Sequence, residues 1–196
     1  MGAFELSAIY GFSADNIWCA GAFVNDNPTP LPTFIHQSLI IHFNGTKWET
    51  INSPKGDLLT RLWGSASDDI WAWGMENSLF HYDGTSWIKD SIELSIPENG
   101  GFQITRICGT SGAAFATDVT LIDYVLNETH YFFTWNNNKW TKADSFVISS
   151  TSQEYKFGTR LWMPKDGYLL SYGSEGIFQW SGGGWQKNST IIQLHV

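Results

Sequence analysis

The stretch Leu62–Trp87, LWGSASDDIWAWGMENSLFHYDGTSW, decides the fold. Residues 79–82 alternate between two faces, as the side chains of a β-strand do. The pair Asp83-Gly84 is a strong hairpin signal, because tight hairpin turns need positive φ angles. The stretch therefore predicts a small antiparallel sheet with tight turns.

The same local spacing recurs three more times along the chain, at intervals of roughly 45 residues. In each copy a tryptophan stands three residues after a turn residue. The tryptophans are Trp48, Trp87, Trp140 and Trp185, and the turn residues are Gly45, Gly84, Asn137 and Gly182. We expect these tryptophans to pack between neighbouring repeats, each burying roughly 150–250 Å².

Each repeat contains four short apolar runs joined by turn-forming residues, and none contains a capped helical pattern. Large residues occur on both faces of each predicted sheet, so each sheet needs a cover on both sides, which radial stacking supplies. The predicted fold is all-β, a β-propeller of four four-stranded blades in a single domain over residues 1–196. The blades cover about residues 4–54, 56–98, 102–153 and 156–196.

Three segments depart from the repeat and are expected to form loops or excursions. Val24–Gln37 contains three prolines, which cannot donate to a strand ladder. Asp118–Glu128 replaces a tight hairpin, and the polar segment Ser145–Tyr155 is expected to loop out. The third repeat has Ala116 and Val119 where the first two repeats have tryptophan and glycine, so its blade should be the least regular.

Closure of the ring has two solutions. The chain begins with a first strand and ends after a fourth, so no strand is left over for exchange between the ends. Four blades form a small closed ring, or two chains join as half-rings in an eight-bladed homodimer with two-fold symmetry. The remaining alternative is that the sequence is a fragment of a longer chain. An open stack would expose two large aromatic faces.

The composition of the chain argues against several classes of protein. Aromatic residues make up 16% of the chain and charged residues 15%, and the net charge is -8. A nucleic-acid partner would need a basic stripe, and none is visible. No apolar run reaches the roughly 18–20 residues of a membrane helix, and no signal peptide is visible. Cys19 and Cys108 do not form a disulfide framework or a CxxC metal site, and we expect both to be buried.

Three arginines occupy the same position in successive repeats, on the first predicted strand: Arg61, Arg106 and Arg160. First strands are usually innermost in a propeller, so these side chains could converge on an anion or carboxylate site in the central channel. Alternatively, each arginine pairs with an acid or a carbonyl of a neighbouring blade. No nucleophile with a matching base is apparent, so the chain is expected not to be an enzyme and to need no cofactor.

His42 and His81 also share a repeat position. They would lie on adjacent blades, too far apart to share a metal ion, so we interpret them as hydrogen-bonding strand residues. Calcium needs 6–8 oxygen ligands, and the chain has no dense run of acids. We therefore interpret the acids and amides near the turns as capping residues, namely Asp15, Asp68, Asp69, Asp83 and Asn44.

The repeat resembles the propeller repeats of many bacterial surface and secreted proteins, with the pattern WGSS..DVWAVG..G.I.HYDG..W. The turn Asp83–Trp87 is also similar to the Asp-box turn between blade strands, and the blades to Kelch-like propeller repeats. The resemblance implies an interaction module in a bacterial secreted or cell-surface protein, and it transfers no catalytic residue.

Three functions follow as hypotheses. The first is a non-enzymatic binding or scaffold module with a protein partner. The second is a lectin-like module that binds a glycan through exposed aromatics such as Trp73, Tyr172 or Trp180. The third is an anion-binding or hydrolytic centre at the three arginines.

Overall fold

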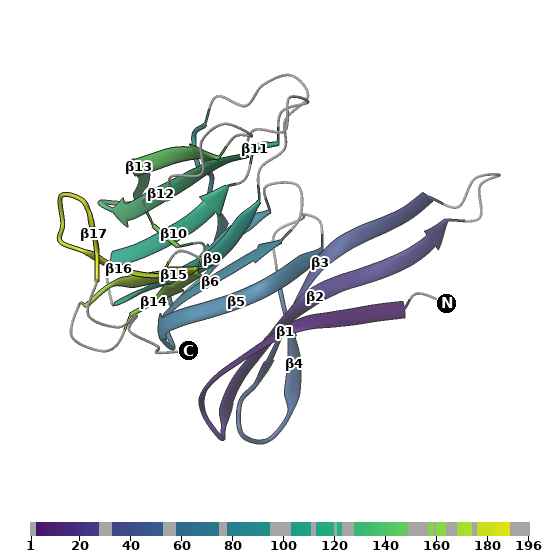
Figure 1. The fold of residues 1–196 in the computed structure, drawn as a ribbon. Helices are drawn as coiled ribbons and strands as arrows, with labels where there is room; N and C mark the ends of the chain where they lie inside the picture. The colour runs from purple at the N-terminus through teal and green to yellow at the C-terminus, as the bar shows by residue number, and fades with distance from the viewer. Residues whose placement is uncertain are drawn as a thin grey trace, which may run out of the picture. The chain divides into compact units, whose positions relative to one another are not determined.

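A computed structural model describes residues 3–27, 33–52, 58–74, 78–94, 103–110, 113–119, 121–122, 128–148, 157–158, 160–163, 168–173 and 176–188. Within these residues the chain is all-β and contains no helix. It divides into two compact units, Met1–Ser91 and Ile92–Val196, and each unit holds two antiparallel sheets (Figure 1).

The first unit contains two four-stranded meanders, each with its strands in chain order. The strands of the first sheet are β1 (Ala3–Ser13), β2 (Asn16–Asn27), β3 (Thr33–Phe43) and β4 (Trp48–Ile51). Those of the second sheet are β5 (Leu59–Ala66), β6 (Asp69–Gly74), β7 (Leu79–Tyr82) and β8 (Trp87–Lys89).

The second unit repeats this arrangement with one irregularity. Its first sheet contains β9 (Ile104–Thr110), β10 (Ala113–Val119), β11 (Leu121–Ile122), β12 (Glu128–Asn136) and β13 (Lys139–Ile148). Its second sheet contains β14 (Arg160–Trp162), β15 (Leu170–Gly173), β16 (Gly176–Trp180) and β17 (Trp185–Lys187). All four sheets are thus antiparallel meanders of the kind that form propeller blades, which confirms the predicted fold class. The mode of ring closure stays a prediction.

In each sheet of the first unit, one side chain holds the turn between the third and the fourth strand. Asp83 Oδ1 accepts hydrogen bonds from the backbone N–H groups of Thr85 and Ser86 and from the Thr85 hydroxyl, at 2.6–2.9 Å. Asn44 holds the equivalent turn in the first sheet through the same three bonds. The prediction that both are turn residues is confirmed.

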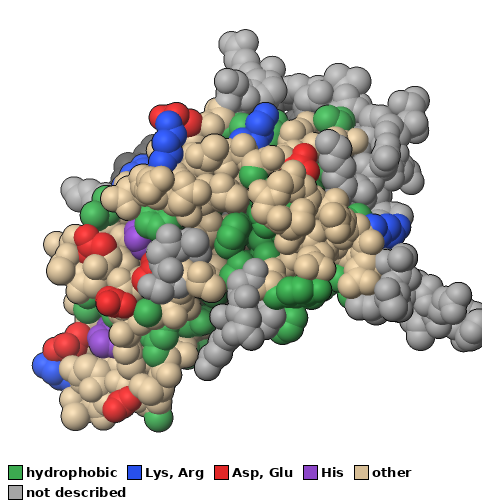
Figure 2. Space-filling view, turned by 90° about the vertical axis from the view of Figure 1, so that its left-hand side faces the viewer, with side chains coloured by type: hydrophobic (Ala, Val, Ile, Leu, Met, Phe, Trp, Pro, Cys, Tyr) green, Lys and Arg blue, Asp and Glu red, His purple; other side chains and the backbone are tan. Residues whose placement is uncertain are grey.

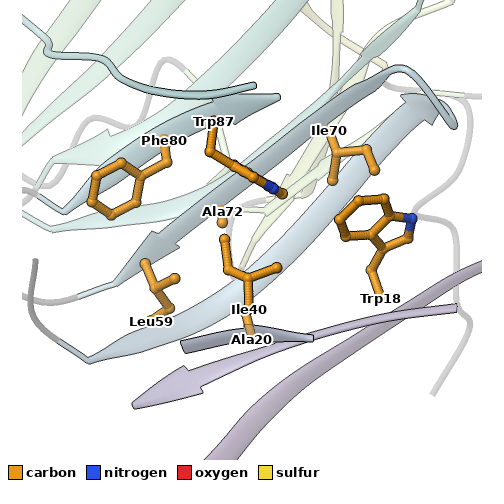
Figure 3. Close-up of a cluster of buried hydrophobic side chains, with 8 residues drawn as sticks. All are labelled: Trp18, Ala20, Ile40, Leu59, Ile70, Ala72, Phe80 and Trp87. Carbon is orange, nitrogen blue, oxygen red and sulfur yellow. The ribbon is translucent and has the colours of Figure 1, made fainter. Parts of the chain in front are cut away.

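Two sheets enclose the core of the first unit. The buried cluster in Figure 3 contains Trp18, Ala20, Ile40, Leu59, Ile70, Ala72, Phe80 and Trp87, drawn from six strands. Tyr10 on β1 donates a 2.9 Å hydrogen bond to the carbonyl oxygen of Gly64 on β5, which joins the first strands of the two sheets. Burial of large apolar side chains between the sheets supplies most of the driving force.

Phe132 lies at the centre of the second unit's core and is fully buried. Its ring centroid lies 4.7 Å from that of Trp180 and 4.9 Å from that of Trp185, which come from the neighbouring sheet. Phe157 completes this aromatic cluster.

The sequence predicts a loop over Val24–Gln37. This prediction is wrong for the residues on either side of the three prolines, which belong to strands. The ladder between β2 and β3 continues beyond the other strands, through pairs such as Asn25 with Ile35 and Asn27 with Thr33. Only the prolines cannot donate to a ladder, and Pro28, Pro30 and Pro32 lie outside the described residues. The residues on either side of them extend the hairpin.

The segment 145–155 was likewise predicted to loop out, but β13 runs to Ile148. Phe146 explains the continuation, because it is buried and its ring stacks at 4.8 Å on that of His130, its cross-strand partner. The excursion predicted at 118–128 contains β11, which pairs with β12 at Thr129. At Glu128 and Thr129, β13 pairs with the other edge of β12. β11 therefore lies on the same edge of β12 as β10, and the two form one interrupted second strand. This is the irregular blade that the sequence predicts.

The predicted packing role of the repeated tryptophans is confirmed for Trp87, which contacts the Trp18 ring of the preceding sheet at 6.0 Å. For Trp48 it stays a prediction, since within the first unit this residue is 49% exposed and packs on Phe43 of its own sheet. The first sheet has no preceding sheet within its unit.

The strand register corrects the alignment of the third repeat with the others. Phe115 pairs with Thr134 as Trp18 pairs with His42, so Phe115 and not Ala116 is the residue equivalent to Trp18.

Candidate functional site

The three arginines lie at equivalent register positions on first strands. Arg61 pairs with Trp73, Arg106 with Thr117, and Arg160 with Tyr172. All three are exposed, and Arg61 Nη1 donates to the carbonyl oxygen of Thr60 at 2.9 Å. Arg61 belongs to the first unit and the other two to the second. Their convergence on one channel remains a prediction.

The two histidines in register are hydrogen-bonding strand residues, as predicted. His42 Nε2 lies 2.9 Å from Asn16 Oδ1, and His81 Nε2 lies 2.7 Å from Asp69 Oδ1. Each ring also stacks on the tryptophan opposite it, at 4.2 Å for Trp18 and 4.1 Å for Trp71. Among the described residues, no group of three or more histidines, cysteines or acids is placed to hold a metal ion.

Hydrogen-bond chemistry assigns the donor nitrogen of the neutral His42 ring. The indole Nε1–H of Trp18 is a donor only, and it lies 3.0 Å from the same atom of Asn16 that His42 contacts. That atom must therefore be the amide oxygen, so His42 donates to it through Nε2–H and keeps Nδ1 as an acceptor. Burial lowers the pKa of His42, against a smaller opposing effect of Glu49, so the ring is neutral at neutral pH.

A pocket of about 580 Å³ opens beside this trio, between the two sheets of the first unit. The first sheet contributes Asn16, Trp18, His42, Ile51 and Asn52. The second sheet contributes Ser67, Tyr82, Thr85, Ser86 and Trp87 from its strand ends and turns. Its base is aromatic and its rim consists of amides and hydroxyls.

Every described residue that lines this pocket is uncharged apart from the titratable His42. The described lining thus contains no carboxylate, lysine or arginine. On the face drawn in Figure 2, charged side chains of both signs occur in small groups among uncharged ones, and the described lysines and arginines form no stripe. The side chains of Asn52, Ser67 and Ser86 have no hydrogen-bond partner within the described part of the chain.

The second sheet differs at one position that matters for the site. Asp69 stands where the first sheet has Asn16, and it accepts hydrogen bonds from Ser65 and His81. The first sheet therefore offers a neutral amide at the mouth of its pocket.

The aromatics proposed from sequence as glycan platforms have different environments. Trp73 is only 3% exposed and cannot present a face to a ligand. Trp180 is half-buried against Phe132 and Trp185. Tyr172 is 43% exposed and is the one of the three that remains accessible.

No family model matches the chain, and no curated protein matches it. Among solved structures, it is similar to the SapL1 lectin in complex with alpha methyl fucoside, with 15% sequence identity and a TM-score of 0.47. The match covers 95% of this chain and 64% of the lectin chain, so the chain spans just under two thirds of that length. Within the described residues, no helix has the length and apolar character needed to cross a membrane.

Proposed function

We propose that this chain is a non-enzymatic binding module and that the pocket between its first two sheets holds a neutral sugar ring. The observation that carries the proposal is the lining, which combines aromatic rings with uncharged amides and hydroxyls. The pocket volume of about 580 Å³ also falls within the ~300–1,000 Å³ of ordinary small-ligand sites.

The charge of the lining favours a neutral ligand. A carboxylate or a phosphate would gain from arginine or lysine, and neither occurs among the described lining residues. Among the described lining residues, the neutral ring of His42 and the amide of Asn16 carry no formal charge. Sugar hydroxyls donate and accept, so they match a lining that offers amides, hydroxyls and the Nδ1 acceptor of His42.

The arrangement of the rings favours a sugar over a flat aromatic ligand. Trp18 lies 4.2 Å from His42 and 5.2 Å from Tyr82, and Tyr82 lies 5.5 Å from Trp87. Because these rings contact one another, no slot remains between them for a stacked flat molecule. Trp18 and Trp87 are only 4% and 7% exposed, so a ligand meets the partly exposed rings of Tyr82 and His42, where negative π faces attract the polarised C–H groups of a sugar.

The same lining supports binding without catalysis. Glycoside hydrolysis generally uses a pair of carboxylates, and the described lining contains none. The Thr85 hydroxyl donates to Asp83, and His42 Nε2–H donates to Asn16, so neither forms a nucleophile–base pair.

A panel of neutral monosaccharides tests the proposal by chemical-shift changes of the tryptophan indole N–H signals. We expect the signals of Trp18 and Trp87 to shift at millimolar sugar. The double variant Asn52→Ala/Ser67→Ala removes two exposed rim groups and should weaken binding about tenfold or more. Thr141→Ala, an exposed hydroxyl on β13, is the matched control and should bind as the wild type. Unchanged indole signals with every sugar would overturn the proposal.

A further inference from the structure

The two sheets of each unit pack on each other through the same pair of faces. The later sheet contributes the face that carries the tryptophan after its last hairpin turn, which is Trp87 in the first unit and Trp185 in the second. The earlier sheet contributes its other face, on which Trp18 lies in the first unit and Phe132 in the second. We call these two surfaces of a sheet its tryptophan face and its reverse face.

Eight of the ten large apolar side chains that are exposed among the described residues lie on only two sheet faces. The first is the tryptophan face of the sheet β1–β4. The strand register places on it Phe4, Leu6, Ile9, Phe23 and Trp48, which are 40–69% exposed. In the described part of these four strands, no charged side chain lies on this face. Another surface can therefore cover it without desolvating a charge on this side.

The second is the reverse face of the sheet β14–β17. Trp162 and Tyr172 lie on it, on the side of the sheet away from the buried Phe178, and are 52% and 43% exposed. Tyr168 belongs to the same face, because its hydroxyl donates a 2.7 Å hydrogen bond to Gln179 Oε1. Among the described residues of this face only Arg160 is charged, and arginine is enriched at protein interfaces.

We infer that the tryptophan face of the sheet β1–β4 packs against the reverse face of the sheet β14–β17 of a second copy of this chain. A tryptophan face packs on a reverse face in both units, so the contact repeats an arrangement that the chain already makes twice. It gives Trp48 the neighbour that Trp87 has in Trp18. Under two-fold symmetry the contact forms twice, and neither face remains open.

The area of the two faces favours a closed pair of copies. The eight side chains are about half exposed and each presents roughly 100 Å². One contact therefore covers roughly 800 Å², which is the size of weak or crystal-packing contacts. The two contacts of a symmetric dimer cover roughly 1,600 Å², which is the standard size of a specific and stable interface.

Light scattering on the full chain across a dilution series tests the inference. We expect a mass of about 44 kDa, twice the 22.1 kDa of one chain. Ile9→Lys and Trp162→Lys each place a charge on one of the two faces, and each should raise the dissociation constant of the dimer about a hundredfold or more. Ile88→Lys alters an equally exposed side chain on neither face and should leave the dimer intact. Circular dichroism should show that all three variants fold as the wild type does.

A mixture of Ile9→Lys and Trp162→Lys tests which faces meet. A mixed pair regains one undamaged contact, because one copy keeps its reverse face and the other keeps its tryptophan face. The mixture should therefore associate more strongly than either variant alone, and no such gain would overturn the pairing of these faces. A wild-type mass near that of one chain at every concentration would overturn the dimer itself. None of the substituted residues lines the proposed sugar pocket, so either failure leaves the proposed function standing.

Discussion

Trp18 and His42 lie opposite each other on β2 and β3, with ring centroids 4.2 Å apart and ring planes inclined by 23°. Asn16 Oδ1 lies within hydrogen-bond distance of both side chains and fixes both rings. The second sheet repeats the stacked pair with Trp71 and His81, and the hydrogen bond of the histidine with Asp69. The trio is therefore a structural element of the blade, and in the first sheet it also forms one side of the pocket.

Replacement of His42 by glutamine, the residue that stands at the equivalent position in the fourth sheet, should remove a pH dependence of stability. Burial lowers the pKa of His42 below 6.5, so the unfolded chain binds a proton more readily than the folded chain. The stability contributed by the neutral ring is complete above the unfolded pKa and is lost as the pH falls through the folded pKa. Urea unfolding at about pH 7 and about pH 5 should show a larger loss for the wild type than for His42→Gln. Equal losses would contradict the lowered pKa.

Much of the fold could be predicted because it is encoded locally. The spacing of Asp83, Gly84 and Trp87 specifies a hairpin, and its recurrence specifies four sheets. The turns at Asn44 and Asp83 follow from side-chain geometry within four residues. The ends of β2, β3 and β13 could not be predicted in this way, because cross-strand pairing extends them through segments rich in turn-forming residues.

The pocket could not be predicted from one repeat, because Asn16 and Thr85 belong to different sheets and meet only when the sheets pack. One signal was available, namely the neutral Asn16 at a position where the second repeat has Asp69. The sequence predicts a site at the repeated arginines because they are charged and occupy the same position in successive repeats. Register alone says which strand position a side chain occupies, and not what that side chain contacts.

Asp83→Asn should preserve the turn and change its response to acid. The Thr85 hydroxyl and the backbone N–H groups of Ser86 and Thr85 lower the pKa of Asp83 to about 2. Its contribution to stability is therefore present above the normal pKa of 3.8 and is lost as the pH falls toward about 2. Asparagine accepts the same bonds without titrating, as Asn44 does in the first sheet. Thermal unfolding of the variant should lose less stability than the wild type between about pH 4 and about pH 2. Asp83→Ala, which removes the acceptor, should be less stable than both near neutral pH.

Cys108 should be inert to thiol reagents in the folded protein. The side chain is buried, and burial raises its pKa from 9.0 to about 12, with Arg106 opposing the shift. The thiolate that reacts is then about a thousandfold scarcer than in an exposed cysteine at the same pH. Burial also raises the pKa of Cys19. Titration with a disulfide reagent at about pH 8 should therefore detect no fast-reacting thiol in native protein and two after unfolding in urea. The variant Cys108→Ser should show one reactive thiol after unfolding. Fast reaction of the native wild type would contradict the prediction, because it would show that a thiol is accessible.

Alanine substitutions at Gly84, Gly182 and Gly183 distinguish two contributions to the free energy of unfolding. One is the strain of a left-handed φ angle, and the other is the steric clash of an added Cβ. Gly84 and Gly182 have φ angles of 90° and 87°, but a Cβ on Gly84 would lie 2.9 Å from the Asp68 Cβ, whereas one on Gly182 would meet nothing within 4 Å. Gly182→Ala should cost about 1–2 kcal/mol in the free energy of unfolding, because the left-handed region disfavours a Cβ. Gly84→Ala should cost about 1–3 kcal/mol more, because Asp68 must move away.

Gly183→Ala is the control for both variants, because a Cβ there would meet nothing within 4 Å and the residue lacks a left-handed φ. It should change the free energy of unfolding by less than about 0.5 kcal/mol. Gly45→Ala, whose added Cβ would lie 2.7 Å from the Asp15 Cβ at a φ of 89°, should behave like Gly84→Ala. Urea unfolding followed by circular dichroism measures all four. If Gly84→Ala and Gly182→Ala cost the same, the approach of Asp68 to the turn is looser than the structure has it, and the φ angle alone explains the glycine.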